Sequence, residues 1–330
     1  MTSGGTSLEI GLNAVIVAVA NRVPAIVQVS DPAGREPDSL PFGPFDPLRH
    51  RTFEIGLRTW VEEQTALRLG YVEQLYTFGD RGRHRQREDQ DPHVVSVGYL
   101  ALTRQSTDAE EVLSQHHSSW RSWYDYFPWE DWREGRPDVL DQTILPALET
   151  WAREDPAEDA QPYLLTRAER LRIAFGDEEH GFDEERALER YELLYEAGLL
   201  EEALRDQRPA ALARPALPRL GRPMRHDHRR ILATAISRLR AKLKYRPVIF
   251  ELMPWTFTLT ELQGSVEAIS GRHLHKQNFR RLVETADLVE PTGATSTATG
   301  GRPAALFRFR HELLKERPGL GLRVGGRAGT

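Results

Sequence analysis

The sequence predicts an α+β protein with three parts: a mixed sheet-and-helix domain over residues 1–150, an acidic helical connector with a proline-rich linker over residues 151–224, and a module of three helices and a hairpin over residues 225–330. Apolar, β-branched segments flank one amphipathic helix near the N-terminus. Residues 151–206 are acidic and apolar at helical spacing, and four prolines then interrupt residues 207–223. Three further amphipathic segments precede a final alternating one.

Composition excludes several kinds of site. The 330 residues include no cysteine, which excludes disulfides, thiolate metal ligands and a cysteine nucleophile. The longest early apolar run, residues 12–29, contains Asn13, Asn21, Arg22, Pro24 and Gln28, so it does not fit a membrane span. No basic segment precedes it to mark a signal peptide. We therefore expect a cytoplasmic protein with no membrane partner.

The two ends of the chain differ in charge. Residues 221–330 contain 20 lysines and arginines against 9 aspartates and glutamates, a formal charge of +11, whereas the rest of the chain carries −16. Such a division is typical of a basic nucleic-acid module joined to an acidic partner domain. Chance clustering is the alternative explanation.

The N-terminal domain is predicted from hydrophobic periodicity. Thr52–Leu67 has apolar residues at spacings of three and four and is expected to be a helix. Residues 31–50 are rich in proline and glycine and are expected to form a loop. The predicted strands are 13–20, 25–29, 71–78 and 94–102.

The C-terminal module has clearer boundaries. Residues 226–244 place apolar side chains on one helical face. Thr258 and Glu261 have the spacing of a capping box, which predicts a helix of about twelve residues that ends at Gly271. A third helix over 276–285, a flexible run over 291–302 and an alternating strand over 304–310 follow. Three helices and a hairpin in this order indicate a winged helix-turn-helix.

The third of these helices is the candidate DNA-reading helix, because the second helix of a helix-turn-helix enters the major groove. With Phe279, Leu282 and Val283 facing inward, polar and cationic side chains face outward; we predict DNA contacts from Lys276, Gln277, Asn278, Arg280 and Arg281. Arg302, at the end of the glycine-rich loop, is the predicted wing contact. The alternative is that these charges only form a solvated helix face.

Seven aromatic residues crowd the segment 120–132. We expect them to form a local core that packs the acidic helices on the N-terminal domain. An adenine-stacking wall or a dimer surface would use the same residue types.

Two segments of the N-terminal domain resemble the core of Nudix domains of the ADP-ribose pyrophosphatase type: residues 73–80 (EQLYTFGD) and 94–102 (VVSVGYLAL). Residues 44–66 resemble a degraded Nudix box, whose pattern is G-x5-E-x7-R-E-U-x-E-E-x-G-U with U a bulky aliphatic. Its arginine falls on Arg58 and its final glutamates on Glu62 and Glu63. Its two glycines fall on Pro44 and Thr65, and its two other glutamates fall on His50 and Thr59.

The replacement at Thr59 is the one that matters for chemistry. Positions 59, 62 and 63 share one helical face, where three carboxylates would hold Mg²⁺. Thr59 supplies no charge, so we predict no catalytic residues and no metal site. Glu62 and Glu63 then belong to a solvated face, or Glu62 pairs with Arg58.

A Nudix-like domain followed by a winged helix resembles the Nudix-related transcriptional regulators of NAD metabolism, the NrtR-like proteins. The matching C-terminal motifs are 257–263 (FTLTELQ), 278–281 (NFRR), 301–304 (GRPA) and 306–309 (LFRF). Residues 120–210 lie outside the family pattern and suggest a divergent subgroup. His275 stands where family members often have an acidic helix cap.

This resemblance implies a Nudix-like α/β/α sandwich before the winged helix, and a dimeric repressor of NAD biosynthesis or salvage genes that binds a palindromic double-stranded DNA operator. It also implies an effector, ADP-ribose, ATP or a related NAD metabolite, and no required cofactor. The effector residues expected from the former substrate cleft are Arg58, Glu62, Glu63, Phe78 and Asp80. The alternatives are an active ADP-ribose-type pyrophosphatase with an accessory basic domain, and a scaffold whose winged helix binds protein.

Overall fold

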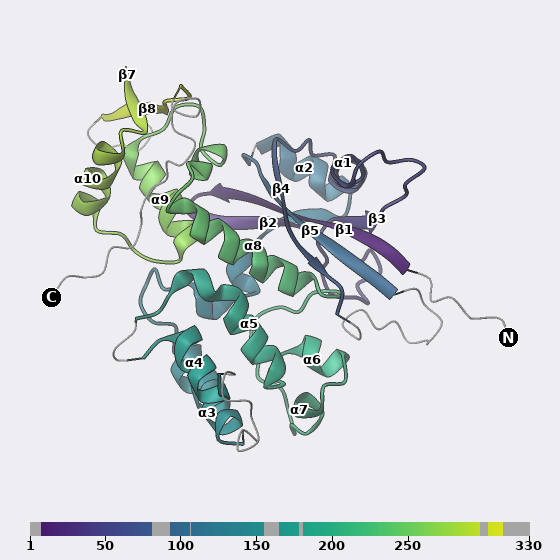
Figure 1. The fold of residues 1–330 in the computed structure, drawn as a ribbon. Coiled ribbons are helices and arrows are strands. Elements are labelled where there is room, and N and C mark those ends of the chain that lie inside the picture. Colours follow the sequence, from purple (N-terminus) through teal and green to yellow (C-terminus); the bar gives the residue numbers. More distant parts are fainter. Residues whose placement is uncertain are drawn as a thin grey trace.

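The computed structural model describes residues 8–80, 93–105, 107–154, 165–177, 181–297 and 303–312. It has the predicted α+β architecture, with a mixed sheet, a group of helices and a C-terminal module that carries a small hairpin (Figure 1). Within the described ranges, no helix is both long enough and apolar enough to cross a membrane.

A six-stranded mixed sheet forms the centre of the molecule. Its strand order is β4-β5-β1-β2-β6. β3 lies off this path and pairs with a part of β1 that does not pair with β2. β1 runs parallel to β5 and antiparallel to β2 and β3. The strands are β1 (Leu8–Ala20), β2 (Val23–Val29), β3 (Phe42–Pro44), β4 (Tyr71–Phe78), β5 (His93–Leu102) and β6 (Ser118–Ser122). The predicted strands are confirmed, whereas β3 lies in the expected loop and β6 was not predicted.

Helices cover both faces of the sheet. Leu12, Ala14 and Ile16 of β1 pack with α1 (Phe53–Thr65) and with Leu113 of α2 (Thr107–Gln115). The alternate residues, Val15 and Val17, face α8 (His228–Leu243) on the opposite side. Gly98 permits this close packing, because a Cβ atom there would lie 3.0 Å from Cγ2 of Ile231. The sheet and these helices form a three-layer sandwich (Figure 1).

Residues 123–227 lie between β6, the last strand of this sheet, and the covering helix, α8. This segment, which we call the insertion, includes the acidic connector predicted over residues 151–224. It contains η1 (Trp123–Asp125), η2 (Pro128–Glu130), η3 (Leu140–Ile144), α3 (Leu145–Arg153), α4 (Arg167–Phe175), η5 (Glu184–Arg186), α5 (Ala187–Glu196), α6 (Glu201–Arg205) and α7 (Pro209–Leu212). Pro209 begins the short α7 within the expected linker. α5 packs along α8, so α8 lies between the sheet and the insertion (Figure 1).

The aromatic cluster is a core, as expected. Trp123, Tyr126, Phe127 and Trp129 are fully buried. Phe127 packs edge to face on Trp129, with ring centroids 5.6 Å apart, and also contacts Tyr191 of α5. These rings therefore attach the inserted helices to the sheet.

The C-terminal module follows α8. It contains η6 (Val248–Glu251), α9 (Leu259–Ser270), α10 (Lys276–Ala286) and the antiparallel hairpin β7 (Val289–Ser296) and β8 (Ala304–Phe309). β7 extends into the run that was expected to be flexible. We expected α8 to be the first helix of this module. It packs on α9, but it also packs on β1, β4 and β5, because its apolar side chains face both the module and the sheet.

Candidate nucleic-acid interface

α9 is fixed by local signals at both ends. Oγ1 of Thr258 accepts a hydrogen bond from the backbone N–H of Glu261 at 3.2 Å, and the Glu261 carboxylate accepts one from the N–H of Thr258 at 2.7 Å. The helix ends at Gly271, whose φ of 72° is left-handed. The capping box and the glycine stop are confirmed as the sequence predicted.

α10 begins at Lys276 and has one apolar face. Phe279 and Val283 are buried in the main core and Leu282 is half-buried, so one side of the helix is packed, and α9 is among its neighbours. His275 occupies the position before the helix and makes no side-chain capping bond. The opposite side of α10 faces away from the sheet and the insertion (Figure 1).

The predicted DNA contacts share that outer side. Lys276, Gln277, Asn278, Arg280 and Arg281 are all exposed. Among the described residues, none of the five has a side-chain hydrogen bond or ion pair with another residue. Their donors are available to a ligand, unlike those of most arginines within the described ranges. Arg302, the predicted wing contact, lies outside the described residues.

The hairpin has its own cations, but these are paired. Nε of Arg308 lies 2.6 Å from Oε1 of Glu290, and Arg310 forms an ion pair with Asp287. Phe307 and Phe257 exchange backbone hydrogen bonds of 2.8 and 3.0 Å, which attach the hairpin to the segment before α9. The wing is therefore held beside α10, and the unpaired cations of the module's described part are concentrated on α10.

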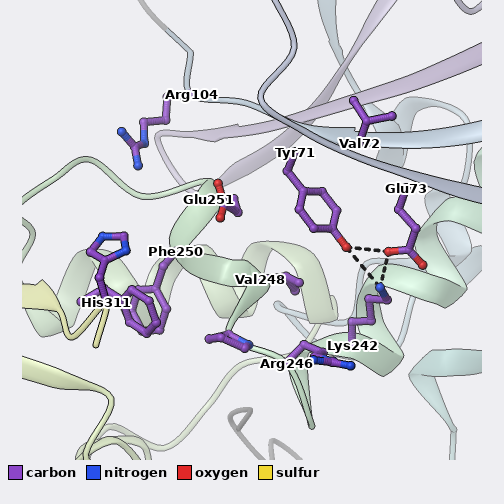
Figure 2. Close-up of a pocket in the computed structure, with 12 residues that line it drawn as sticks. Tyr71, Val72, Glu73, Arg104, Lys242, Arg246, Val248, Phe250, Glu251 and His311 are labelled. Atoms are coloured by element: carbon purple, nitrogen blue, oxygen red, sulfur yellow. Dashed lines mark hydrogen bonds and ion pairs between the residues drawn. The ribbon is translucent and has the colours of Figure 1, made fainter. Parts of the chain in front are cut away.

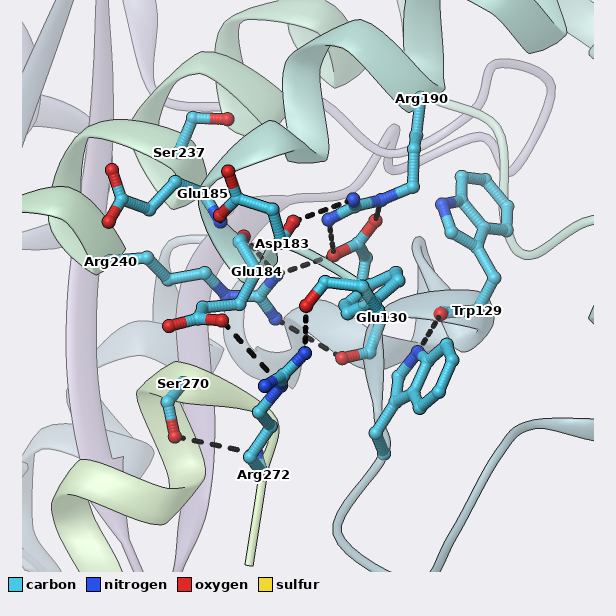
Figure 3. Close-up of polar contacts among 12 residues, drawn as sticks. Trp129, Glu130, Asp183, Glu184, Glu185, Arg190, Ser237, Arg240, Ser270 and Arg272 are labelled. Atoms are coloured by element: carbon cyan, nitrogen blue, oxygen red, sulfur yellow. Dashed lines mark hydrogen bonds and ion pairs between the residues drawn. The ribbon is translucent and has the colours of Figure 1, made fainter. Parts of the chain in front are cut away.

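A buried charge cluster holds α9 on the rest of the protein (Figure 3). Glu130 of η2 is fully buried and accepts hydrogen bonds from Arg190 of α5 at 2.6 and 2.8 Å. Arg240 of α8 makes an ion pair with the same carboxylate at 2.5 Å and donates to the backbone O of Ile269 in α9 at 2.9 Å. We call Glu130, Arg190 and Arg240 the buried triad. It joins the insertion, α8 and the helix-turn-helix.

The turn between α9 and α10 is held by the same region. The backbone N–H of Trp132 donates to the O of Gly271 at 2.7 Å, and Arg272 donates to the O of Phe182. On the other flank, Arg22 in the β1–β2 turn forms an ion pair with Glu267 at 2.5 Å. The helix-turn-helix is thus attached to the insertion and to the sheet.

Gly271→Ala should test how closely this turn is packed. The φ of 72° is unfavourable for alanine, and its Cβ would lie 2.4 Å from the backbone O of Glu130. We expect a loss of unfolding free energy above the roughly 1–3 kcal/mol typical of left-handed strain alone, measured by chemical denaturation. Gly34→Ala is the control, because Gly34 has a φ of 63° and nothing within 4 Å of the added Cβ. Equal losses in the two variants would contradict the close packing.

The degraded Nudix box forms the loop before α1 and the helix itself. Trp60 donates from Nε1 to the O of Pro44 at 2.8 Å, which fixes the loop to the helix. Thr59, at the position of a metal-binding glutamate in the family pattern, donates its hydroxyl to the O of Ile55 at 3.0 Å. Among the residues that the structure describes, no group of three or more potential ligands from histidine, aspartate and glutamate is placed to hold a metal ion.

Of the two alternatives for Glu62, the pair with Arg58 is not formed, and the solvated helix face is what the structure shows. Arg58 pairs instead with Glu54, one turn earlier, at 2.8 Å, and Glu62 pairs with Arg68 at 3.1 Å. Arg58 also donates to the backbone O of Gly70, so its guanidinium is directed toward the end of the helix. Glu62 and Glu63 are both exposed.

The five predicted effector residues do not form one site. Arg58, Glu62 and Glu63 lie on α1, on one side of the sheet. Phe78 is buried on the α8 side, with the guanidinium carbon of Arg230 5.1 Å from its ring centroid, and Asp80 pairs with that same arginine. The structure therefore brings Phe78 and Asp80 together beside Arg230, and it places Arg58, Glu62 and Glu63 apart from them on α1.

Comparison with known proteins places these features in a family context. Residues 249–309 match the family model described as the NrtR DNA-binding winged helix domain. Over 83 residues, 25% of this chain, the sequence is 45% identical to the ADPR responsive transcriptional repressor NtrR of Acinetobacter baylyi. That match spans 33% of the relative's length.

Two solved structures share the overall fold. The crystal structure of Shewanella oneidensis NrtR complexed with a 27mer DNA aligns with a TM-score of 0.53 and 20% identity, over 91% of this chain and 93% of that one. A MutT/nudix family protein from Enterococcus faecalis aligns with a TM-score of 0.50 and 14% identity, over 94% and 89% of the two chains. The predicted fold, a Nudix-like sandwich followed by a winged helix-turn-helix, is confirmed.

Proposed function

On the premise that residues 249–309 form a winged helix domain of the NrtR type, we propose that this protein is a transcriptional repressor that binds double-stranded DNA through α10. The observation that carries the proposal is the exposed side of α10. It presents two arginines, a lysine and two amide side chains, which have no partner among the described residues. Arginine reads guanine and asparagine or glutamine reads adenine in the major groove.

The regulated genes and the effector follow from the relatives. We propose that the protein controls genes of NAD biosynthesis or salvage in the cytoplasm, and that an adenine-containing metabolite such as ADP-ribose controls its DNA binding. The 45% identity to an ADPR responsive repressor supports this proposal. No cofactor is required for it.

The DNA target is proposed to be a palindrome bound by a homodimer. Two copies of α10 would then enter major grooves about one helical turn (~34 Å) apart.

Within each chain, we propose that the acidic connector is an insertion in the sheet domain and that the DNA-binding domain begins near residue 249, where the family match begins. α8 connects the two parts.

Selection of DNA fragments by the purified full-length protein from a genomic library tests the function. We expect enrichment of a short inverted repeat, and protection of two half-sites one turn apart in a footprint. ADP-ribose should change the measured affinity for that site. Failure to bind any duplex at low salt would contradict the proposal and favour a protein-binding scaffold, since basic DNA-binding domains bind even random duplexes under that condition.

We also propose that the chain is not a working pyrophosphatase. Incubation with ADP-ribose and Mg²⁺ should give no AMP above the rate without protein, measured by chromatography, because Thr59 leaves the face of α1 with only Glu62 and Glu63 as carboxylates. Sustained release of AMP that Glu63→Gln abolishes would instead identify an enzyme with an accessory DNA-binding domain.

A further inference from the structure

The C-terminal end of α9 is held by groups from outside the winged helix. A helix leaves the carbonyl groups of its last turn without partners inside the helix, so they need partners elsewhere. The backbone O of Ala268 accepts a hydrogen bond at 2.8 Å from Oη of Tyr124, which lies in η1 at the start of the insertion. The backbone O of Ile269 accepts one at 2.9 Å from Nε of Arg240 in α8. The last turn of α9 is therefore completed by η1 and α8.

The turn that follows α9 is bonded to the insertion as well. The backbone N–H of Trp132 donates to the O of Gly271 at 2.7 Å. Arg272, the next residue of the turn, donates to the backbone O of Phe182, and its Nε lies 3.6 Å from Oε2 of Glu184 (Figure 3). Both attachments are made only a few residues before α10 begins. The insertion therefore holds the turn that leads into the DNA-reading helix.

These attachments are closely packed. Tyr124 is buried, and a Cβ atom added at Gly271 would lie 2.4 Å from the backbone O of Glu130 and 3.0 Å from Oη of Tyr124. α9 also contacts β1 and β2, and Arg22 in the turn between these strands pairs with Glu267 at 2.5 Å. The insertion and the sheet thus hold α9 together. Because α10 follows α9 directly, its position relative to the sheet is fixed through α9.

The insertion lies outside residues 249–309, the part that matches the family model, yet it is bonded to that part. Its position matters when two chains bind one operator. The second α10 then raises the affinity by roughly 10²–10⁴-fold, but only if both copies reach their half-sites at once. In a dimer that pairs through the sheet domains or the insertions, a fixed α10 in each chain allows this at one half-site separation.

We propose that the insertion sets the separation of the half-sites that this protein accepts, and that Tyr124 and Arg272 are the positioning residues. The proposal rests on the proposed function in that two copies of the chain bind one operator. Tyr124 acts through the end of α9, and Arg272 acts through the turn. Loosening these attachments allows α10 to reach half-sites at other separations. The effect is therefore on selectivity among spacings and not on binding to one half-site.

Fluorescence anisotropy with duplexes of different spacing tests the proposal. The full-length proteins are titrated with the selected operator, with operators that have one or two base pairs inserted between the half-sites, and with a duplex that holds a single half-site. Each inserted base pair moves the half-sites about 3.4 Å further apart and rotates one relative to the other. The affinity of the wild type should therefore fall by about tenfold or more on insertion.

The Tyr124→Phe/Arg272→Ala double variant should lose only about threefold or less on the same insertions, because its two copies of α10 adjust to the longer site. Its affinity for the single half-site should equal that of the wild type. Tyr124→Phe alone removes one hydroxyl, and it should change the dependence on spacing in the same direction by a smaller factor. Circular dichroism verifies that each variant is folded.

Tyr126→Phe/Arg153→Ala is the matched control. It removes a tyrosine hydroxyl from the same segment, where Oη of Tyr126 donates to Asp38 at 3.1 Å, and an exposed arginine from α3. The bond between Tyr126 and Asp38 does not involve the winged helix. The dependence of affinity on spacing should equal that of the wild type.

Two results for the variants would overturn the proposal. One is an unchanged dependence on spacing in both Tyr124→Phe and the double variant. The other is an equal loss of affinity for every duplex, the single half-site included, which is the result of a merely structural role. A wild type that binds its operator but accepts every spacing overturns the role of the insertion and leaves the proposed function intact. A wild type that binds no duplex contradicts the proposed function and this proposal with it.

Discussion

Glu130→Gln is expected to lower the free energy of unfolding by about 3–5 kcal/mol, because removing one member of a buried ion cluster leaves the others uncompensated. Arg190 and Arg240 would remain fully buried without their shared carboxylate. Urea denaturation followed by tryptophan fluorescence measures the loss, since Trp129 adjoins Glu130 in the sequence and is itself buried.

Asp141→Asn is the control for this result. It removes a carboxylate from the same insertion that also pairs with one arginine, Arg136, at 2.8 Å, but at the surface. Exposed ion pairs contribute little to stability, so the midpoint of denaturation should hardly change. Similar losses in the two variants would show that burial does not determine the contribution of Glu130.

The stabilities of the wild type and of Glu130→Gln should also depend differently on pH. Burial opposes ionisation of Glu130, but Arg190 and Arg240 lower its pKa below the usual value of 4.5. A carboxyl with a lowered folded-state pKa stabilises the protein above its unfolded pKa and loses that effect as pH falls through its folded value. Near neutral pH, the free energy of unfolding of the wild type should therefore exceed that of Glu130→Gln by the whole expected amount. This difference should decrease only below about pH 4.5.

Arg280→Ala and Arg281→Ala are expected to weaken operator binding by about 1–3 kcal/mol for each arginine that reads a base. Both side chains are exposed on α10 and have no partner among the residues described. Fluorescence anisotropy with the selected operator and with mutated operators measures the effect. An arginine that reads guanine should lose discrimination at one position, whereas a phosphate contact should weaken all sequences alike and reduce the salt dependence.

Arg153→Ala controls for the loss of one positive charge, since Arg153 lies on α3 in the insertion. Its affinity for the operator should equal that of the wild type. Unchanged binding in both α10 variants would show that another surface contacts the duplex.

Local signals made the C-terminal module predictable. Three signals each act within a few residues: the capping box of Thr258 and Glu261, the left-handed Gly271, and the apolar spacing of Phe279 and Val283. The bounds of α9 and the buried side of α10 can therefore be predicted from the local sequence alone. The same holds for α1, where Thr52 caps the helix. The exposed side of α10 followed directly from its buried side.

Other features depend on partners far along the chain. The buried triad joins residues separated by 60 and 110 positions, and none of its members has a distinctive sequence context. The cavity of about 490 Å³ between β4, η6 and β8 likewise draws its lining from separate elements between Tyr71 and His311 (Figure 2). Phe78 could be assigned to a strand but not to a face, because the helix that covers that face, α8, follows 150 residues later. Long-range packing decided these points.

The position of α8 in the chain has a consequence for biosynthesis. β1, β2, β5 and β6 are complete once residue 122 has been translated, but the helix that covers one side of their sheet begins at His228. Until α8 has been translated, it cannot cover the side chains of Val15, Val17, Leu100 and Leu102. The nascent chain must therefore leave the ribosome with an apolar sheet surface open while the whole insertion is being made. Chaperones that bind such surfaces should associate with ribosomes stalled before residue 228 and leave once α8 has emerged.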